Sequence, residues 1–181
     1  MQVNTGIDLG FADGVRALMR QDPDFIMVGE IRDHDTANMA IQDALTGHLV
    51  LSTLHTNDAP SSLTRLHDLG VQPFLTAATI LGVLAQRLVR TLCPHCKREG
   101  FMEEQEWQHL TGDYKITRPE FVFEPVGCEE CRHTGYKGRV GIYEFMPLSL
   151  DTKHLIGENA DLNQFRAQAK KEGIEPLRIA G

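Results

Sequence analysis

Phe25-Ile26-Met27-Val28-Gly29-Glu30 is the stretch that decides the fold of this 181-residue chain. Four apolar residues in a row, closed by glycine and an acidic residue, are typical of a strand buried in a parallel sheet. Apolar residues then recur on one helical face over residues 37–45, and Asp33 or Asp35 can cap that helix. A second apolar strand covers about residues 49–54. The strand–helix–strand order predicts an α/β fold with a parallel sheet and flanking helices.

Helical patterns surround this unit. Apolar spacing predicts a helix over residues 11–19, and Asn57 or Asp58 can cap another that ends at Gly70. A seam at three- and four-residue steps predicts one long amphipathic helix over residues 74–92. Further on, the patterns predict an acidic helix, a strand and a small helix that packs Leu162 and Phe165, at residues 103–110, 140–145 and 161–171.

Composition narrows the class of protein. Charged residues make up 24% and hydrophobic residues 41%, which is ordinary for a folded globular chain. The net charge is −7, and no basic cluster in the sequence offsets it. Because nucleic-acid binding needs a positive surface, we count this charge against such a role. No apolar run reaches the roughly 20 residues that span a bilayer.

All four cysteines occur in two C-x-x-C pairs, and we expect them to be reduced. Two residues between cysteines allow both thiolates to face one tetrahedral ion, so the spacing predicts a closed structural zinc site. The alternatives are redox pairs, idle thiols, or a neighbouring His95 or His133 replacing one cysteine. The predicted zinc ligands are Cys93, Cys96, Cys128 and Cys131.

Three side chains are candidates for phosphate chemistry. Glu30 ends the first strand, where a carboxylate can orient water or hold Mg²⁺. His48 precedes the second strand and His55 follows it, so only His55 should reach the edge of the sheet that carries Glu30. The alternatives are a core strand that ends in a solvated acid and histidines that merely cap the ends of a strand.

Together these segments resemble the secretion ATPase superfamily, specifically the type II secretion and type IV pilus assembly ATPases. Residues 20–33 look like the family's Walker B region, with Gly-Glu in place of Asp-Glu, and residues 46–57 look like its His box. Residues 85–90 before the first cysteine pair and residues 138–144 after the second are also typical. The four cysteines resemble those of assembly and secretion motors, which retraction motors lack.

The resemblance implies a partial RecA-like P-loop NTPase core with a small zinc subdomain and C-terminal helices. It makes Glu30 the catalytic carboxylate, places His55 as sensor of the γ-phosphate, and adds His48 to the catalytic set, in support of the Walker B edge. Glu30 and His55 would also contact the cofactors, ATP and Mg²⁺. Arg32, Arg87 and Arg90 could stabilise transition-state charge or could simply be solvated.

The chain departs from the family in one respect: no G-x-x-x-x-G-K-[ST] motif occurs in it. We therefore expect a fragment of a longer ATPase, with negligible ATPase activity by itself, because the phosphate-cradling loop and its lysine are missing. The expected divisions are residues 1–92 for the core with Walker B and His box, 93–146 for the zinc subdomain, and 147–181 for the C-terminal helical segment.

The longer protein implied by the resemblance is a hexameric ATPase that powers type II protein secretion, through pseudopilus assembly, or type IV pilus assembly. It would be cytoplasmic and peripheral to the inner membrane, with membrane platform proteins as partners, without insertion into the bilayer or contact with nucleic acid. The alternative is a zinc-stabilised interaction module without catalysis. A zinc-ribbon nucleic-acid binder is disfavoured, since the sequence offers no basic face.

Overall fold

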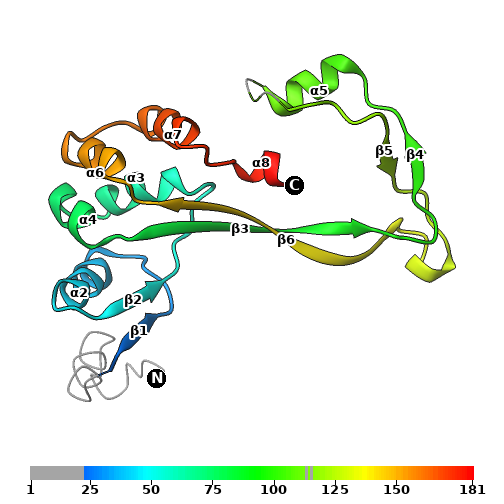
Figure 1. The fold of residues 1–181 in the computed structure, drawn as a ribbon. Coiled ribbons are helices and arrows are strands. Elements are labelled where there is room, and N and C mark those ends of the chain that lie inside the picture. Colours follow the sequence, from blue (N-terminus) through cyan, green and yellow to red (C-terminus); the bar gives the residue numbers. More distant parts are fainter. Residues whose placement is uncertain (1–22, 113, 115) are drawn as a thin grey trace. The chain divides into compact units, whose positions relative to one another are not determined.

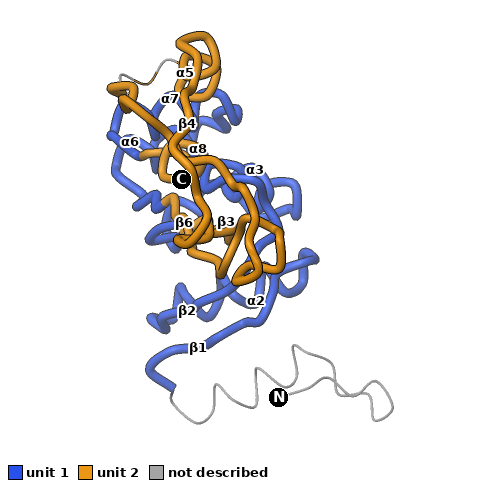
Figure 2. Tube along the Cα trace, turned by 90° about the vertical axis from the view of Figure 1, so that its right-hand side faces the viewer, with its two compact units in different colours: residues 1–83, 145–174 blue, residues 84–144, 175–181 orange. Residues whose placement is uncertain are grey.

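A computed structural model describes residues 23–112, 114 and 116–181 (Figure 1). The helix expected over residues 11–19 lies outside them. The chain forms two compact units (Figure 2): unit 1 comprises Met1–Val83 with Phe145–Ile174, and unit 2 comprises Leu84–Glu144 with Glu175–Gly181. The three-part domain division drawn from the sequence stays a prediction.

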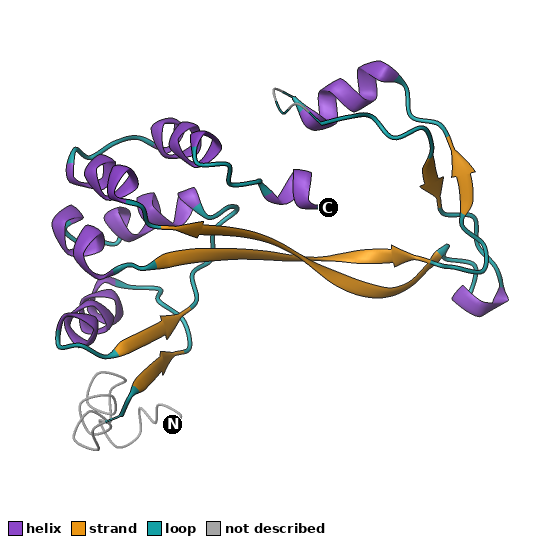
Figure 3. Ribbon diagram, viewed as in Figure 1, coloured by secondary structure: helices purple, strands orange, loops and turns teal. Residues whose placement is uncertain are grey.

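Unit 1 contains the predicted strand–helix–strand element. Strand β1 (Phe25–Val28) pairs in parallel with β2 (Leu49–Ser52), and helix α2 (His34–Leu45) connects them (Figure 3). The pairing sets Phe25 opposite Leu49 and Val28 opposite Ser52. The prediction of an α/β fold with a parallel sheet is confirmed, and both strands therefore end at the same edge.

Local chemistry fixes the helix ends in unit 1. Asp33 caps α2, since its side chain accepts a hydrogen bond of 2.8 Å from the backbone N–H of Thr36. Helix α3 (Pro60–Asp68) starts with proline, and Gly70, with φ +87°, follows its end where the sequence predicted it. The N-cap is Ala59 and not the predicted Asn57 or Asp58, although the Asp58 carboxylate accepts from the N–H of Ser61. Helix α4 (Pro73–Thr79) comes next.

Strand β1 is buried on one face only, although the sequence predicted a wholly buried strand. Ile26 and Val28 lie in the core, whereas Phe25 is 66% exposed and Met27 72% exposed. The buried face packs against α2, chiefly Ala37, Ala40 and Ile41. The expectation failed because a continuous apolar run does not reveal how many faces of a strand are covered.

The long helix predicted over residues 74–92 is wrong. Helix α4 ends at Thr79, Ile80 is extended with ψ 126°, and Gly82–Leu92 form strand β3. Strand β3 pairs with β6 (Tyr136–Pro147), which extends the strand predicted over residues 140–145 at both ends, and the two run in opposite directions (Figure 3). Pairing with a strand more than forty residues away overrides the helical apolar spacing.

Two C-terminal helices complete unit 1. Helix α6 (Leu150–Gly157) packs against α4, and α7 (Leu162–Lys171) packs against both α3 and α6. Asp161 caps α7 through a hydrogen bond of 3.0 Å from the N–H of Gln164. Phe165 is buried as predicted, whereas Leu162 is only half-buried.

Unit 2 contains short elements around the cysteines. Strands β4 (Arg98–Gly100) and β5 (Val122–Glu124) pair antiparallel, and the predicted acidic helix is α5 (Glu104–Thr111). The short 3-10 helix η2 (Glu129–Cys131) and helix α8 (Leu177–Ala180) also belong here. Over the described part of the chain, no helix is both long and apolar enough to cross a membrane.

Candidate functional site

The ends of β1 and β2 are tied together by hydrogen bonds from Thr53. Its hydroxyl donates to the carbonyl of Gly29 over 2.7 Å, and its carbonyl accepts from the N–H of Ile31 over 3.0 Å. These bonds hold the backbone on both sides of Glu30 beside the segment that leads to His55. The parallel sheet thus brings both predicted site residues to its carboxyl edge.

Glu30 is the centre of this site. One carboxylate oxygen, Oε1, lies 2.5 Å from Nε2 of His55, and the other, Oε2, accepts a hydrogen bond of 2.5 Å from Nε of Arg32. The Glu30 side chain is 18% exposed, whereas His55 is 85% and Arg32 75% exposed. The hydrogen bond from Arg32 lowers the pKa of Glu30 most; desolvation opposes it, and the charges of Arg32 and His55 assist. Glu30 is therefore ionised at neutral pH.

An ionised carboxylate beside an exposed imidazole suits chemistry on a bound phosphate. Ligands of open α/β sheets bind outside the carboxyl ends of the strands, and Glu30 and His55 stand at that edge. The carboxylate can orient a water molecule or hold a divalent cation, and the imidazole can donate a hydrogen bond to an anionic oxygen.

His48 lies at the opposite end of β2. Its Nδ1 is 3.0 Å from the hydroxyl of Thr46 and 3.2 Å from the carbonyl of Asp43. Asp43 is 8% exposed, and burial raises the pKa of its carboxyl despite the opposing charge of His48. The structure brings Glu30 and His55 together and leaves His48 apart from them; its catalytic role stays a prediction.

The three candidate arginines have different surroundings. Arg32 contacts Glu30, as described above. Arg87 and Arg90 belong to unit 2, where Arg87 donates to the carbonyl of Gln86 over 3.1 Å and Arg90 stacks 3.8 Å from the ring centre of Tyr136. Arg32 thus has a described contact with a predicted catalytic side chain, Glu30.

The four cysteines converge in unit 2. Their sulfur atoms all lie within 4.8 Å of one another, and the group contains neither His95 nor His133. Individual separations are 4.0 Å for Cys93–Cys128 and 3.8 Å for both Cys96–Cys131 and Cys128–Cys131. Tetrahedral zinc thiolates, with Zn–S near 2.3 Å, have sulfurs about 3.8 Å apart. The spacing of the sulfurs therefore fits a tetrahedral ion.

Backbone donors surround these sulfurs. The N–H of Gly127 donates to Cys96 over 3.3 Å, and those of Cys128 and Gly135 donate to Cys131 over 3.2 Å. Burial acts to raise the pKa of Cys131, but these two N–H groups and its thiol neighbours lower it to about 6. Burial raises the pKa of Cys96 to about 11. The donor set is typical of the outer shell around a thiolate-bound metal.

The family model described as "Type II/IV secretion system protein" matches residues 1–181. The chain belongs to this family. It is 76% identical over 181 residues to "Type IV pilus assembly ATPase TfpB" of Acinetobacter baylyi, covering all of this chain and 31% of that protein. It is 48% identical over 184 residues to "Type II secretion system ATPase E" of Vibrio cholerae, covering 98% of this chain and 36% of that one.

Solved structures of an ATPase and of a pilus retraction motor share the fold. The ATPase DotB of Legionella pneumophila matches with a TM-score of 0.55 and 26% identity, over 90% of this chain and 34% of that one. The pilus retraction motor PilT with bound ADP gives the same TM-score and identity, over 94% and 42%. The chain spans about a third of the length of the curated relatives it matches.

Sequence reasoning missed the residues that support this secretion-family site. Thr53 was read only as part of the second strand, yet it ties the two strand ends together. Gly127 and Gly135 flank the second cysteine pair and donate to its sulfurs; their nearness to the pair was the available signal. Arg166 contacts Asp58 from 108 positions away in the sequence, so no local sequence pattern could have predicted this pair.

Proposed function

We propose that this chain forms part of the ATP-hydrolysing core of a secretion or pilus-assembly motor. The observation that carries the proposal is the pair Glu30–His55 at the carboxyl edge of a parallel sheet, with 2.5 Å between Oε1 and Nε2. Family membership supports it, since relatives of this chain are named as secretion and pilus-assembly ATPases. The activity belongs to the complete protein, because the chain contains no phosphate-binding loop motif.

In this proposal, Glu30 orients the attacking water and helps to hold the Mg²⁺ of Mg-ATP. When bound, Mg²⁺ neutralises charge on the β- and γ-phosphates. Arg32 holds the Glu30 carboxylate in place through a hydrogen bond that also lowers the pKa of Glu30. His55 exchanges its contact with Glu30 for a hydrogen bond to the γ-phosphate, which makes the segment sensitive to ATP.

The test is Glu30→Gln in the complete gene product that carries this chain. Removing the negative charge while keeping the shape should lower kcat by about 100-fold or more, with nucleotide binding unchanged. Glu99→Gln, an exposed position in unit 2, is the matched control. Steady-state turnover and equilibrium binding of a fluorescent ATP analogue are the measurements. Normal turnover in the Glu30→Gln variant would remove the mechanism.

We also propose that Cys93, Cys96, Cys128 and Cys131 hold one structural Zn²⁺. The fit of the sulfur separations to a tetrahedron and the backbone N–H donors support this. Four thiolates leave no open coordination position, so the ion would stabilise unit 2 and take no part in hydrolysis. Elemental analysis should find one zinc per chain, and Cys128→Ser should remove most of it. Far less than one zinc in the unmodified protein would contradict the proposal.

For the complete protein we propose a hexamer that works on the cytoplasmic side of the inner membrane with membrane platform proteins. The names of the relatives support a machine for secretion or pilus assembly, and they include both systems. Light scattering after size-exclusion chromatography with and without ATP tests the hexamer. The alternative, a non-catalytic zinc module, is favoured only if the complete protein shows no nucleotide turnover.

A further inference from the structure

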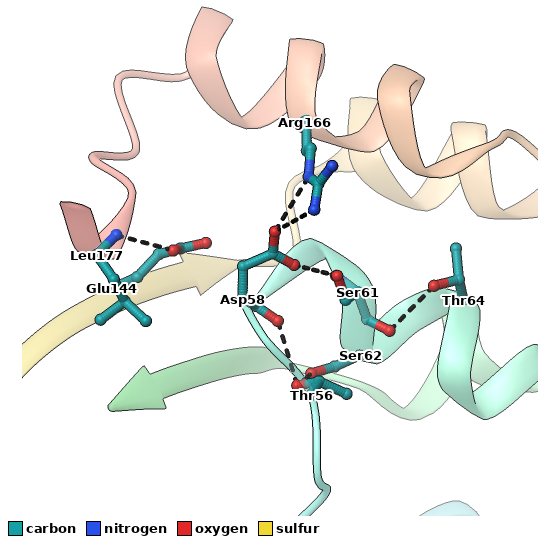
Figure 4. Close-up of polar contacts among 8 residues, drawn as sticks. All are labelled: Thr56, Asp58, Ser61, Ser62, Thr64, Glu144, Arg166 and Leu177. Carbon is teal, nitrogen blue, oxygen red and sulfur yellow. Dashed lines mark hydrogen bonds and ion pairs between the residues drawn. The ribbon is translucent and has the colours of Figure 1, made fainter. Parts of the chain in front are cut away.

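An ion pair with two N–H donors joins helix α7 to the chain just after His55 in unit 1. Arg166 donates from Nε over 3.0 Å and from Nη2 over 2.6 Å to one oxygen of Asp58, Oδ2 (Figure 4). The other oxygen, Oδ1, accepts from the N–H of Ser61 over 2.9 Å and from its hydroxyl. The carboxylate of Asp58 thus ties the start of α3 to α7, and its side chain is 21% exposed.

The segment between His55 and Asp58 is held at several further points. The hydroxyl of Thr56 donates to the carbonyl of Asp58 over 3.2 Å and shares a hydrogen bond of 2.9 Å with the hydroxyl of Ser62 (Figure 4). Ala59, directly after Asp58, is fully buried. We call residues 53–58 the His55 segment. One end is fixed through Thr53 to Gly29, directly after β1, and the other is fixed to α7 through Asp58.

Helix α7 is anchored independently of Arg166. Phe165 and Ala169 are buried beneath it, 5% and 6% exposed. Near its end, Glu172 accepts from the hydroxyls of Ser149 over 2.5 Å and Thr152 over 3.3 Å. Arg166 itself is 50% exposed, so its guanidinium adds little to the apolar packing of the helix. Removing the guanidinium should leave α7 in place and remove the tie between α7 and the far end of the His55 segment.

We propose that Arg166 is a positioning residue: through Asp58 it fixes the His55 segment, so that His55 meets Glu30 and the γ-phosphate in one defined place. This inference rests on the proposed ATPase function. In this proposal, helix α7 couples the C-terminal helices to the nucleotide site through the contact between Arg166 and Asp58. Two N–H donors of one planar guanidinium converge on a single carboxylate oxygen, which gives the contact a more defined direction than a lysine ammonium would.

The experiment compares Arg166→Gln, Arg166→Lys and Lys171→Gln in the complete gene product. Lys171 is the matched control, since it lies on the same helix and its ion pair with Asp151, at 3.5 Å, is exposed. In Arg166→Gln, amide hydrogen exchange over residues 53–58 should accelerate about tenfold, while residues 25–28 keep their protection. The kcat for ATP should fall about tenfold with KM unchanged, because the contact acts on geometry at the reacting end. The exchange rate and the kcat of Arg166→Lys should lie between those of Arg166→Gln and of the unmodified protein.

Each outcome decides the inference. Equal exchange over residues 53–58 in Arg166→Gln and Lys171→Gln would overturn it, whatever the ATPase rates. Faster exchange throughout unit 1 would also overturn it, since that result shows a merely structural contact. Faster local exchange with unchanged kcat would remove the link to catalysis, provided that Glu30→Gln is inactive. If even the unmodified protein lacks turnover, the proposed function fails, and the exchange data alone then decide whether Arg166 holds the segment.

Discussion

The contacts of the Glu30 carboxylate follow from its place at the end of a strand. Arg32 stands two positions along the chain, and His55 arrives through the parallel pairing of β1 with β2. The first contact is encoded locally, whereas the second needs the sheet. A fold that merely presented Glu30 to solvent would give it neither an ion pair nor a nearby imidazole.

Asp58 gives this protein a specific sensitivity to acid. Burial acts to raise the pKa of its carboxyl, but hydrogen bonds from Ser61 and Arg166 outweigh it and lower the pKa below the ordinary value of 3.8. The stabilisation is therefore complete above pH 3.8, the value of the unfolded chain, and is lost as pH falls through the lower pKa of the folded state. At neutral pH, Asp58→Asn should cost about 1.5 kcal/mol.

Urea unfolding at a series of pH values between about 3 and 7 measures this effect. The stability difference between the unmodified protein and Asp58→Asn should shrink only at the acid end of that range. Asp151→Asn, at an exposed pair on α6, is the control and should leave the pH profile unchanged. A constant difference throughout would show that the charge of Asp58 contributes nothing.

Gly135 and Gly138 provide a matched test of the cysteine cluster. Both have positive φ, +76° and +87°, so alanine strains the backbone equally. At Gly135 an added Cβ would lie 2.6 Å from Cβ of Pro125, whereas at Gly138 it would meet nothing within 4 Å. The contact with Pro125 would force the backbone at Gly135 to shift, and with it the N–H that donates to Cys131. Gly135→Ala should therefore weaken zinc binding about tenfold or more, and Gly138→Ala should not.

Competition with a chromogenic zinc chelator measures both glycine variants under the same conditions. Equal zinc affinity in the two would show that the placement of the Gly135 backbone has no bearing on the metal.

At the scale of elements, the β1–α2 contact positions the site. Val28 is fully buried against α2 and lies two residues before Glu30. Val28→Ala removes two buried methyl groups and should lower the free energy of unfolding by about 2 kcal/mol. Val140→Ala, at a strand position 53% exposed, should change it by less than about 0.5 kcal/mol. Chemical denaturation compares them, and equal losses would contradict the assigned core.

The elements that sequence predicted well are those with local signals. Asp33 and Gly70 mark helix boundaries through capping and a positive φ, and the structure has them in those roles. The pairing of Glu30 with His55 followed from two strand ends in a parallel sheet. These features depend on a few adjacent residues, or on one general rule of sheet geometry.

The misjudged elements depend on distant partners. Residues 82–92 carry apolar side chains at helical spacing, yet they pair with β6, which begins at Tyr136. Phe25 and Met27 read as buried, although only the face of β1 toward α2 is covered. Arg166 finds Asp58 only once α7 is folded against α3. In each case the deciding partner lies far away in the sequence, where no local pattern reports it.

At the scale of the whole molecule, the two compact units should respond differently to loss of metal. If zinc supplies the roughly 10–16 kcal/mol typical of structural sites, unit 2 depends on it far more than unit 1 does. Chelation at neutral pH should abolish amide protection around residues 93–100 and 122–135. Protection in β1, α2 and β2 should persist. Exchange measured by mass spectrometry reports both regions in one sample, and simultaneous loss in both would contradict the division.

Unit 1 is discontinuous along the chain, since residues 84–144 of unit 2 separate its two parts. During synthesis, β1, α2, β2 and α3 therefore emerge well before α6 and α7. The ion pair of Asp58 cannot form until Arg166, 108 residues later in the chain, has been synthesised. At typical translation rates that interval is on the order of ten seconds. Until it ends, the apolar surfaces that α6 and α7 will cover stay open on the ribosome. The nascent chain is therefore most prone to aggregate in this interval, until α7 leaves the ribosome and packs against α3.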